Sequence, residues 1–148
     1  MDTELVARLR AVIPRLARVL NDTSTGADLT PTQYSVLALT HVRGPLGLTE
    51  LTELEGINPT MLSRVVKNLD ERGLIRRTQD PGDLRAARVE ATPEGARLHD
   101  LVRTQRTKVL SECLQALPPD TAAMLLAAVP DLEALAESLK PAPKPAKT

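Results

Sequence analysis

Aromatic residues are almost absent from this chain of 148 residues, which has one tyrosine and neither phenylalanine nor tryptophan. Apolar residues still make up 42% of the sequence. The core must therefore consist of leucine, valine and alanine, which suit helix-on-helix packing. We expect a mainly α-helical fold in which any ligand pocket is aliphatic, with Tyr34 as its only aromatic wall.

The chain has a single cysteine, Cys113, so an internal disulfide bond is excluded. This fits a reducing, cytoplasmic setting. Because Leu110, Leu114 and Leu117 flank Cys113, we expect a small buried side chain and not a reactive thiol. The sequence also shows neither a signal-peptide layout nor an apolar run long enough to cross a membrane. We therefore expect a cytoplasmic protein without a membrane partner.

Neither sign of charge dominates, because 19 lysine and arginine residues balance 19 aspartate and glutamate residues. Net charge thus gives no general attraction to nucleic acid, although a local basic patch can still bind it. Catalytic motifs are missing too, with no Ser-His-Asp layout and no phosphate-binding glycine loop. His41 and His99 lie far apart in the sequence and do not form a zinc motif. We expect neither an enzyme nor a bound metal or cofactor.

Apolar spacing and capping residues predict six helices. The second of them is expected to have Thr30 as its N-cap, Pro31 at its first position and Gln33 at its third. Pro14 inside the first helix predicts a kink or a broken first turn, and Pro130 inside the last predicts a kink. A very short strand is expected over 46–48. The proline- and lysine-rich end, 140–148, has the composition of a disordered tail. The predicted helices cover residues 3–20, 30–43, 49–56, 58–73, 92–117 and 120–139.

The third and fourth of these helices have the pattern of a helix-turn-helix. Thr49 is expected to cap the third helix, and Gly56 to end it in a left-handed conformation. Asn58 and Pro59 are suited to the N-cap and first position of the fourth helix, which Gly73 ends. Two short helices joined by a tight turn that contains glycine are typical of this motif.

The fourth helix is expected to bury an apolar stripe and expose a polar face. Arginine and asparagine can make paired hydrogen bonds to guanine and adenine edges, whereas lysine, serine and threonine bind phosphates. The helix N-terminus also offers N–H groups to a phosphate. An ordinary solvated face would have the same composition, so this helix alone leaves both interpretations open. The predicted buried stripe is Leu62, Val65, Val66 and Leu69, and the predicted DNA-reading face is Asn58, Thr60, Met61, Ser63, Arg64, Lys67 and Asn68.

A β-hairpin is predicted to follow, with strands over 74–78 and 87–91 around the turn 80–83. Arg85 lies just after the turn, where an arginine can enter a narrow minor groove. Taken alone, an arginine at this place is better interpreted as an exposed charge of the hairpin. Asp83 would repel phosphate, so we expect it to hold Arg85 or close the turn. The candidate DNA-binding set is completed by three arginines of the strands, Arg76, Arg77 and Arg88.

These elements, in this order, resemble the MarR family of bacterial transcriptional regulators. The resemblance rests on Leu74-Ile75-Arg76-Arg77, on Asp83 and Arg85 in the wing, on Thr92-Pro93-Glu94-Gly95, and on the helix over 58–73. It covers the chain except for the tail. It implies one domain over 1–139, with a winged helix-turn-helix lobe over 30–92 and dimerisation helices over 1–20 and 94–139.

The resemblance further implies a homodimeric repressor that binds double-stranded DNA at a palindromic operator. The helix over 58–73 would enter the major groove and the wing over 78–88 the minor groove. A small lipophilic effector would release the DNA. Leu84 stands where many relatives have a second arginine, so either the wing grips DNA less firmly or Leu84 packs under the hairpin. The alternative is a winged-helix module that binds a protein and no specific DNA sequence. Dimerisation is also favoured by apolar residues that one small protomer cannot bury, namely Leu125, Leu126, Val129, Leu132 and Leu135.

Overall fold

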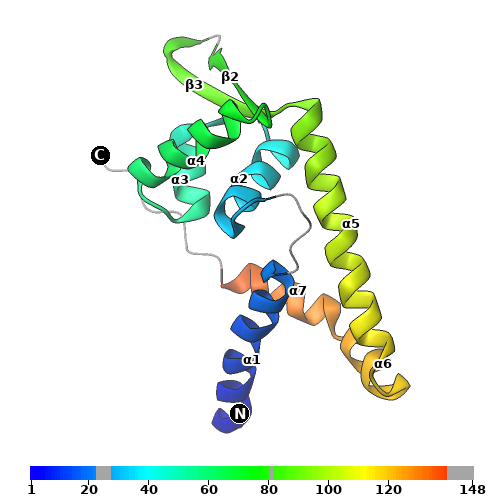
Figure 1. Ribbon diagram of the computed structural model, residues 1–148. Coiled ribbons are helices and arrows are strands. Elements are labelled where there is room, and N and C mark those ends of the chain that lie inside the picture. The colour runs from blue at the N-terminus through cyan, green and yellow to red at the C-terminus, as the bar shows by residue number, and fades with distance from the viewer. Residues whose placement is uncertain (23–27, 81, 140–148) are drawn as a thin grey trace. The chain divides into compact units, whose positions relative to one another are not determined.

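The computed structural model describes residues 1–22, 28–80 and 82–139. They fall into two compact units, one within residues 1–109 and the other beginning at residue 110. The expected fold class, mainly helical with a small β-hairpin wing, is confirmed. The elements are α1 (Thr3–Asp22), α2 (Pro31–Val42), β1 (Leu46–Gly47), α3 (Leu48–Glu55), α4 (Pro59–Glu71), β2 (Ile75–Asp80), β3 (Asp83–Ala91), α5 (Pro93–Gln115), α6 (Pro119–Ala127) and α7 (Val129–Ser138) (Figure 1).

The start of α2 confirms the predicted capping pattern. The Thr30 hydroxyl accepts a hydrogen bond from the Gln33 backbone N–H at 3.2 Å, and Gln33 Oε1 accepts one from the Thr30 N–H at 3.0 Å. Pro31 occupies the first turn, where its missing N–H leaves no bond unmade. Two N–H groups that a helix start leaves unpaired are thereby satisfied.

The helix-turn-helix is present, with one difference at the start of α3. This helix begins at Leu48 with Gly47 as its N-cap, and no side-chain hydrogen bond caps it. The expectation that Thr49 caps it is wrong, because the helix follows directly on β1 and leaves no residue between strand and helix for a side-chain cap. Its predicted end is confirmed, since Gly56 has a φ of 66°, in the left-handed region.

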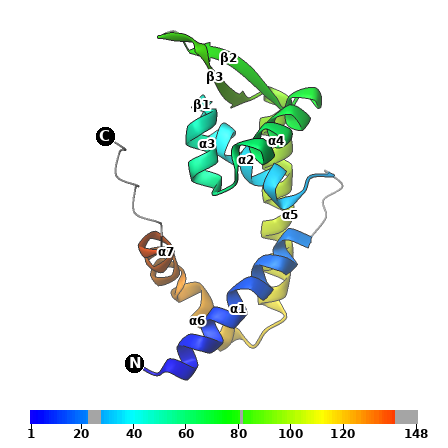
Figure 2. The same cartoon turned by 90° about the vertical axis from the view of Figure 1, so that its left-hand side faces the viewer.

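The three strands form an antiparallel sheet in the order β1-β3-β2. Leu46 lies opposite Val89, and Ile75 lies opposite Ala91. The hairpin strands extend further toward the turn than the predicted 74–78 and 87–91, because their polar residues pair across the ladder instead of forming a wide loop. Figure 2 shows this hairpin reaching well beyond α3 and α4.

The core of the first unit lies where α2, α3 and α4 meet the sheet. The close packing of α5 against this core depends on Gly95, because a Cβ there would stand 1.9 Å from the Leu74 carbonyl oxygen. The Thr92 hydroxyl donates to the Gly73 carbonyl at 2.6 Å and accepts from the Gly95 N–H at 3.1 Å. These bonds fix the start of α5 at the end of α4. The buried residues that form this core are Val36, Leu37, Leu46, Leu51, Leu62, Val65, Val66, Leu69, Leu74, Ile75 and Val89.

The two proline predictions have different outcomes. Helix α1 runs from Thr3 to Asp22 through Pro14, so the helix is not broken there, and a kink at Pro14 stays a prediction. The predicted single helix over 120–139 is instead two helices that meet at Ala128. Pro130 has no N–H to donate, and its ring would collide with the carbonyl of Leu126 in a continuous helix, which explains a break there.

Cys113 is exposed in this structure, so the expectation of a buried thiol is wrong for the single chain. The leucines around it predict an apolar neighbourhood, but Leu110 and Leu117 are exposed as well. The leucines near Cys113 in the sequence therefore do not cover its side chain. Among the helices described, none is long and apolar enough to cross a membrane. The predicted tail, 140–148, lies outside the described residues.

Candidate nucleic-acid interface

Helix α4 has the two faces that its sequence predicts. All four residues of its apolar stripe are buried, and Leu69 is completely so. The polar face is exposed over two turns of the helix. The exposed members of the predicted DNA-reading face are Asn58, Thr60, Met61, Ser63, Arg64 and Lys67.

The first turn of α4 has little backbone hydrogen-bonding capacity left for a phosphate. Asn58 Oδ1 accepts from the Met61 N–H at 2.8 Å, and the Asn58 carbonyl accepts from the Leu62 N–H at 3.0 Å. Pro59 has no N–H to offer. The Thr60 N–H therefore remains for an outside acceptor, and Asn58 serves as the helix cap with its side-chain oxygen already bonded.

Two cations project from this exposed face. Arg64 makes no hydrogen bond or ion pair within the described residues, so its guanidinium can turn to a ligand. Lys67 lies 3.9 Å from a Glu71 carboxylate oxygen, with both side chains largely exposed. Such a surface pair contributes little to stability, so it does not commit Lys67 to Glu71.

Asn68 is predicted to lie on the exposed face of α4, but the structure does not leave it fully exposed. It is half-buried, and its Oδ1 accepts a hydrogen bond of 3.2 Å from Gln33 Nε2. Gln33 also completes the capping box at the start of α2, so its side-chain amide connects that helix start to α4. The helical spacing alone could not reveal this, because it says nothing of which neighbouring helix covers the edge of the apolar stripe.

The strands of the wing carry the other predicted cations. Arg76 Nε lies 2.7 Å from Glu90 Oε1, and the two residues face each other across β2 and β3. The positive charge of Arg76 is therefore partly balanced within the hairpin. Arg77 is exposed and Arg88 is half-buried. The side chains of Asp83, Leu84 and Arg85 lie outside the described residues, so their predicted roles stay predictions.

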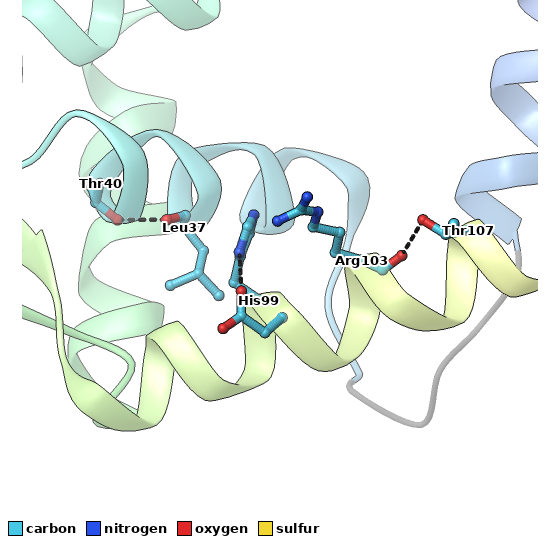
Figure 3. A network of polar contacts seen from close by, with 6 residues as sticks. Leu37, Thr40, His99, Arg103 and Thr107 are labelled. Atoms are coloured by element: carbon cyan, nitrogen blue, oxygen red, sulfur yellow. Dashed lines mark hydrogen bonds and ion pairs between the residues drawn. The ribbon is translucent and has the colours of Figure 1, made fainter.

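A second polar cluster lies between α2 and the first half of α5. His41 and His99, which the sequence separates widely, have ring centroids 4.9 Å apart. Their separation in the sequence therefore does not keep the two rings apart in the fold. His99 is buried, stacks on Tyr34 with centroids 5.6 Å apart, and points from α5 toward α2 (Figure 3). Arg106 covers the Tyr34 ring at 4.2 Å.

A sequence signal for the inward direction of His99 did exist. Gly95, His99 and Val102 follow one another at spacings of four and three residues and are all buried. This is the helical period of a core-facing stripe. What the sequence lacked was any sign that α2 places His41 against this stripe.

Comparisons with known proteins agree with this geometry. The family model described as MarR family matches residues 29–87. An uncharacterised HTH-type transcriptional regulator of Mycobacterium leprae is 30% identical over 119 residues, which span 80% of this chain and 83% of that protein. The crystal structure of a mutant MarR from E. coli superposes with a TM-score of 0.76 at 23% identity, over 86% of this chain and 95% of that one. Streptococcus pneumoniae FabT in complex with DNA gives a TM-score of 0.69 at 14% identity, over 94% and 100%.

Proposed function

The chain belongs to the MarR family of transcriptional regulators, and we propose that it binds duplex DNA by placing the exposed face of α4 in the major groove. The observation that carries this proposal is the clean division of α4, whose apolar stripe is buried while Arg64 and Lys67 project outward. FabT, which shares this fold, was crystallised with DNA. Family and fold both favour a regulator over an enzyme.

Arg64 is proposed as the base-reading side chain. An arginine can bond both acceptors of a guanine edge, and each such pair is worth about 1–3 kcal/mol of discrimination. Asn68 is left out of the base-reading set, because its side-chain oxygen already bonds Gln33. We propose that Thr60, Ser63 and Lys67 bond phosphates and fix the position of α4 along the groove.

The test is to replace Arg64 by alanine and measure binding to the cognate operator and to random duplex of equal length. Affinity for the operator should fall by about 1–3 kcal/mol, with a much smaller loss on random DNA. Lys108→Ala is the control, because it removes one exposed cation from α5, away from α4. Equal losses on both duplexes would show that Arg64 contacts only phosphate, and this proposal for Arg64 would then fail.

We also propose that the chain acts as a homodimer. The exposed leucines and valines of α1, and separately those of α6 and α7, support this, since a monomer seldom leaves the apolar faces of its helices uncovered. Two-fold symmetry would require half-sites about 10 bp apart on a palindromic operator. Repression, the minor-groove role of the wing, and release by a small lipophilic effector belong to the same proposal.

A further inference from the structure

A cluster of imidazole and carboxylate groups lies in the first unit, apart from the exposed face of α4. His41 comes from the end of α2, and His99 and Asp100 come from the first half of α5. The three potential ligand atoms lie within 4.8 Å of one another. We propose that His41, His99 and Asp100 bind a divalent metal ion of the zinc class, with water completing the coordination.

The distances are close to those that a zinc ion needs. Two nitrogens bound tetrahedrally at about 2.0–2.1 Å from zinc lie roughly 3.3 Å apart. The present separations exceed this by up to ~1.5 Å, which rotation of surface side chains can close. His41 and Asp100 are exposed and can make that movement.

His99 supplies the fixed ligand of the three. It is 8% exposed, and its ring lies nearly parallel to that of Tyr34, with an interplanar angle of 8°. Burial and stacking hold the imidazole in one orientation, and the ring of His41 approaches it at a tilt of 48°. The site therefore has one fixed ligand, His99, and two exposed ligands that can move into place when a metal ion binds.

The donor set suits zinc better than magnesium or calcium. Imidazole nitrogen is a good ligand for zinc, copper and nickel, whereas magnesium and calcium require mostly oxygen. Two histidines with one carboxylate and an open position for water is a known zinc donor set. The Asp100 carboxylate already lies 3.3 Å from His99 Nδ1, so its negative charge is in place beside the imidazole.

Two arginines near the proposed site would repel a bound metal ion. Arg106 lies over the Tyr34 ring, which partly balances its charge. Arg103 extends beside His99 from the same face of α5 (Figure 3). Their repulsion lowers the affinity without removing the donor atoms, so we expect weaker binding than in a structural zinc site with four protein ligands.

A bound ion would join the end of α2 to α5. Strand β1 follows α2 closely and pairs with β3. A bound ion would therefore stabilise the end of α2, from which the chain enters the sheet. A ligand that binds only the folded state raises stability as its concentration exceeds its dissociation constant. Metal binding at the proposed site would therefore raise the stability of the winged lobe.

The test uses the untagged full chain and zinc chloride, without DNA. The chain has only two histidines, so imidazole nitrogen resonances in an NMR spectrum report on this cluster alone. We expect both histidines to shift together and to saturate at one zinc per chain, with a higher unfolding temperature. If only one histidine shifts, or neither does, the proposal is overturned.

Variants separate this site from other zinc ligands. Asp100→Asn and His41→Ala change exposed side chains, so the fold should be retained, and each should weaken zinc binding at least ~10-fold. Cys113→Ser is the matched control, because the exposed thiol is the obvious competing ligand. Loss of zinc binding in Cys113→Ser with retention in His41→Ala would overturn the proposal. Neither outcome bears on DNA binding by α4.

Discussion

Helix α4 and helix α1 have the same kind of sequence and opposite surroundings. Both place apolar residues at spacings of three and four, which is the pattern of an amphipathic helix. In α4 the stripe is buried in the core of the winged lobe, residues 30–92. In α1, which is described in full, no residue is buried, and Leu5, Leu9, Ile13 and Leu16 are exposed. Periodicity thus predicts that an apolar face exists without saying what covers it.

Helices α6 and α7 resemble α1 in this respect. Neither has a buried residue along its described length, and each exposes large apolar side chains, among them Leu125 and Leu132. The winged lobe can therefore form its core from one chain, whereas these helices need a further surface. A second copy of the chain is the surface we propose.

The first prediction tests this contrast through stability. Leu69→Ala should lower the free energy of unfolding by about 2–5 kcal/mol, because Leu69 is completely buried and its removal leaves a cavity. The loss should be the same at every protein concentration. Leu132→Ala should have an effect that grows with concentration, since it acts through dimerisation. Urea denaturation at two protein concentrations separates the two, and a concentration-independent loss for Leu132→Ala would contradict the proposed role of α7.

The second prediction concerns the oligomeric state. Leu125→Asp places a charge on an exposed apolar face of α6, where it should be tolerated by a monomer but disfavoured in a dimer interface. We expect the dimer dissociation constant to rise at least ~10-fold, equivalent to about 1.4 kcal/mol. Sedimentation velocity measures this, with circular dichroism to show that the helices remain.

The matched control for that measurement is Glu112→Gln, which changes charge at an exposed position of α5 without altering an apolar face. A dimer that persists unchanged in Leu125→Asp would place the interface elsewhere. A loss of helical signal would instead show that α6 depends on Leu125 within the protomer.

The sequence predicted best where local chemistry decides the structure. The Thr30 cap, the end of α3 at Gly56 and the buried stripe of α4 each follow from a few neighbouring residues. Prediction was wrong where distant residues decide. Cys113 is exposed although leucines flank it, and Asn68 bonds Gln33 of another helix. His41 and His99 meet because the packing of α2 on α5 brings them together, which no local spacing encodes.

The last and smallest effect concerns the wing. Glu90 holds the Arg76 guanidinium at 2.7 Å in a pair whose side chains are 26% and 59% exposed, so its loss should lower stability by at most about 1 kcal/mol. Glu90→Gln should nevertheless strengthen DNA binding, because Arg76 becomes available to a phosphate. One added phosphate contact makes the slope of log affinity against log salt steeper by about 0.9.

Glu94→Gln provides the control for this change. It alters net charge by the same amount and releases Arg97, whose Nη2 lies 3.0 Å from Glu94 Oε2 at the start of α5. If the wing approaches DNA, Glu90→Gln should steepen the salt dependence more than Glu94→Gln does. Equal slopes would mean that Arg76 stays away from the phosphates. The DNA contact would then rest on α4 and on the wing tip, and the hairpin strands would serve to hold that tip in position.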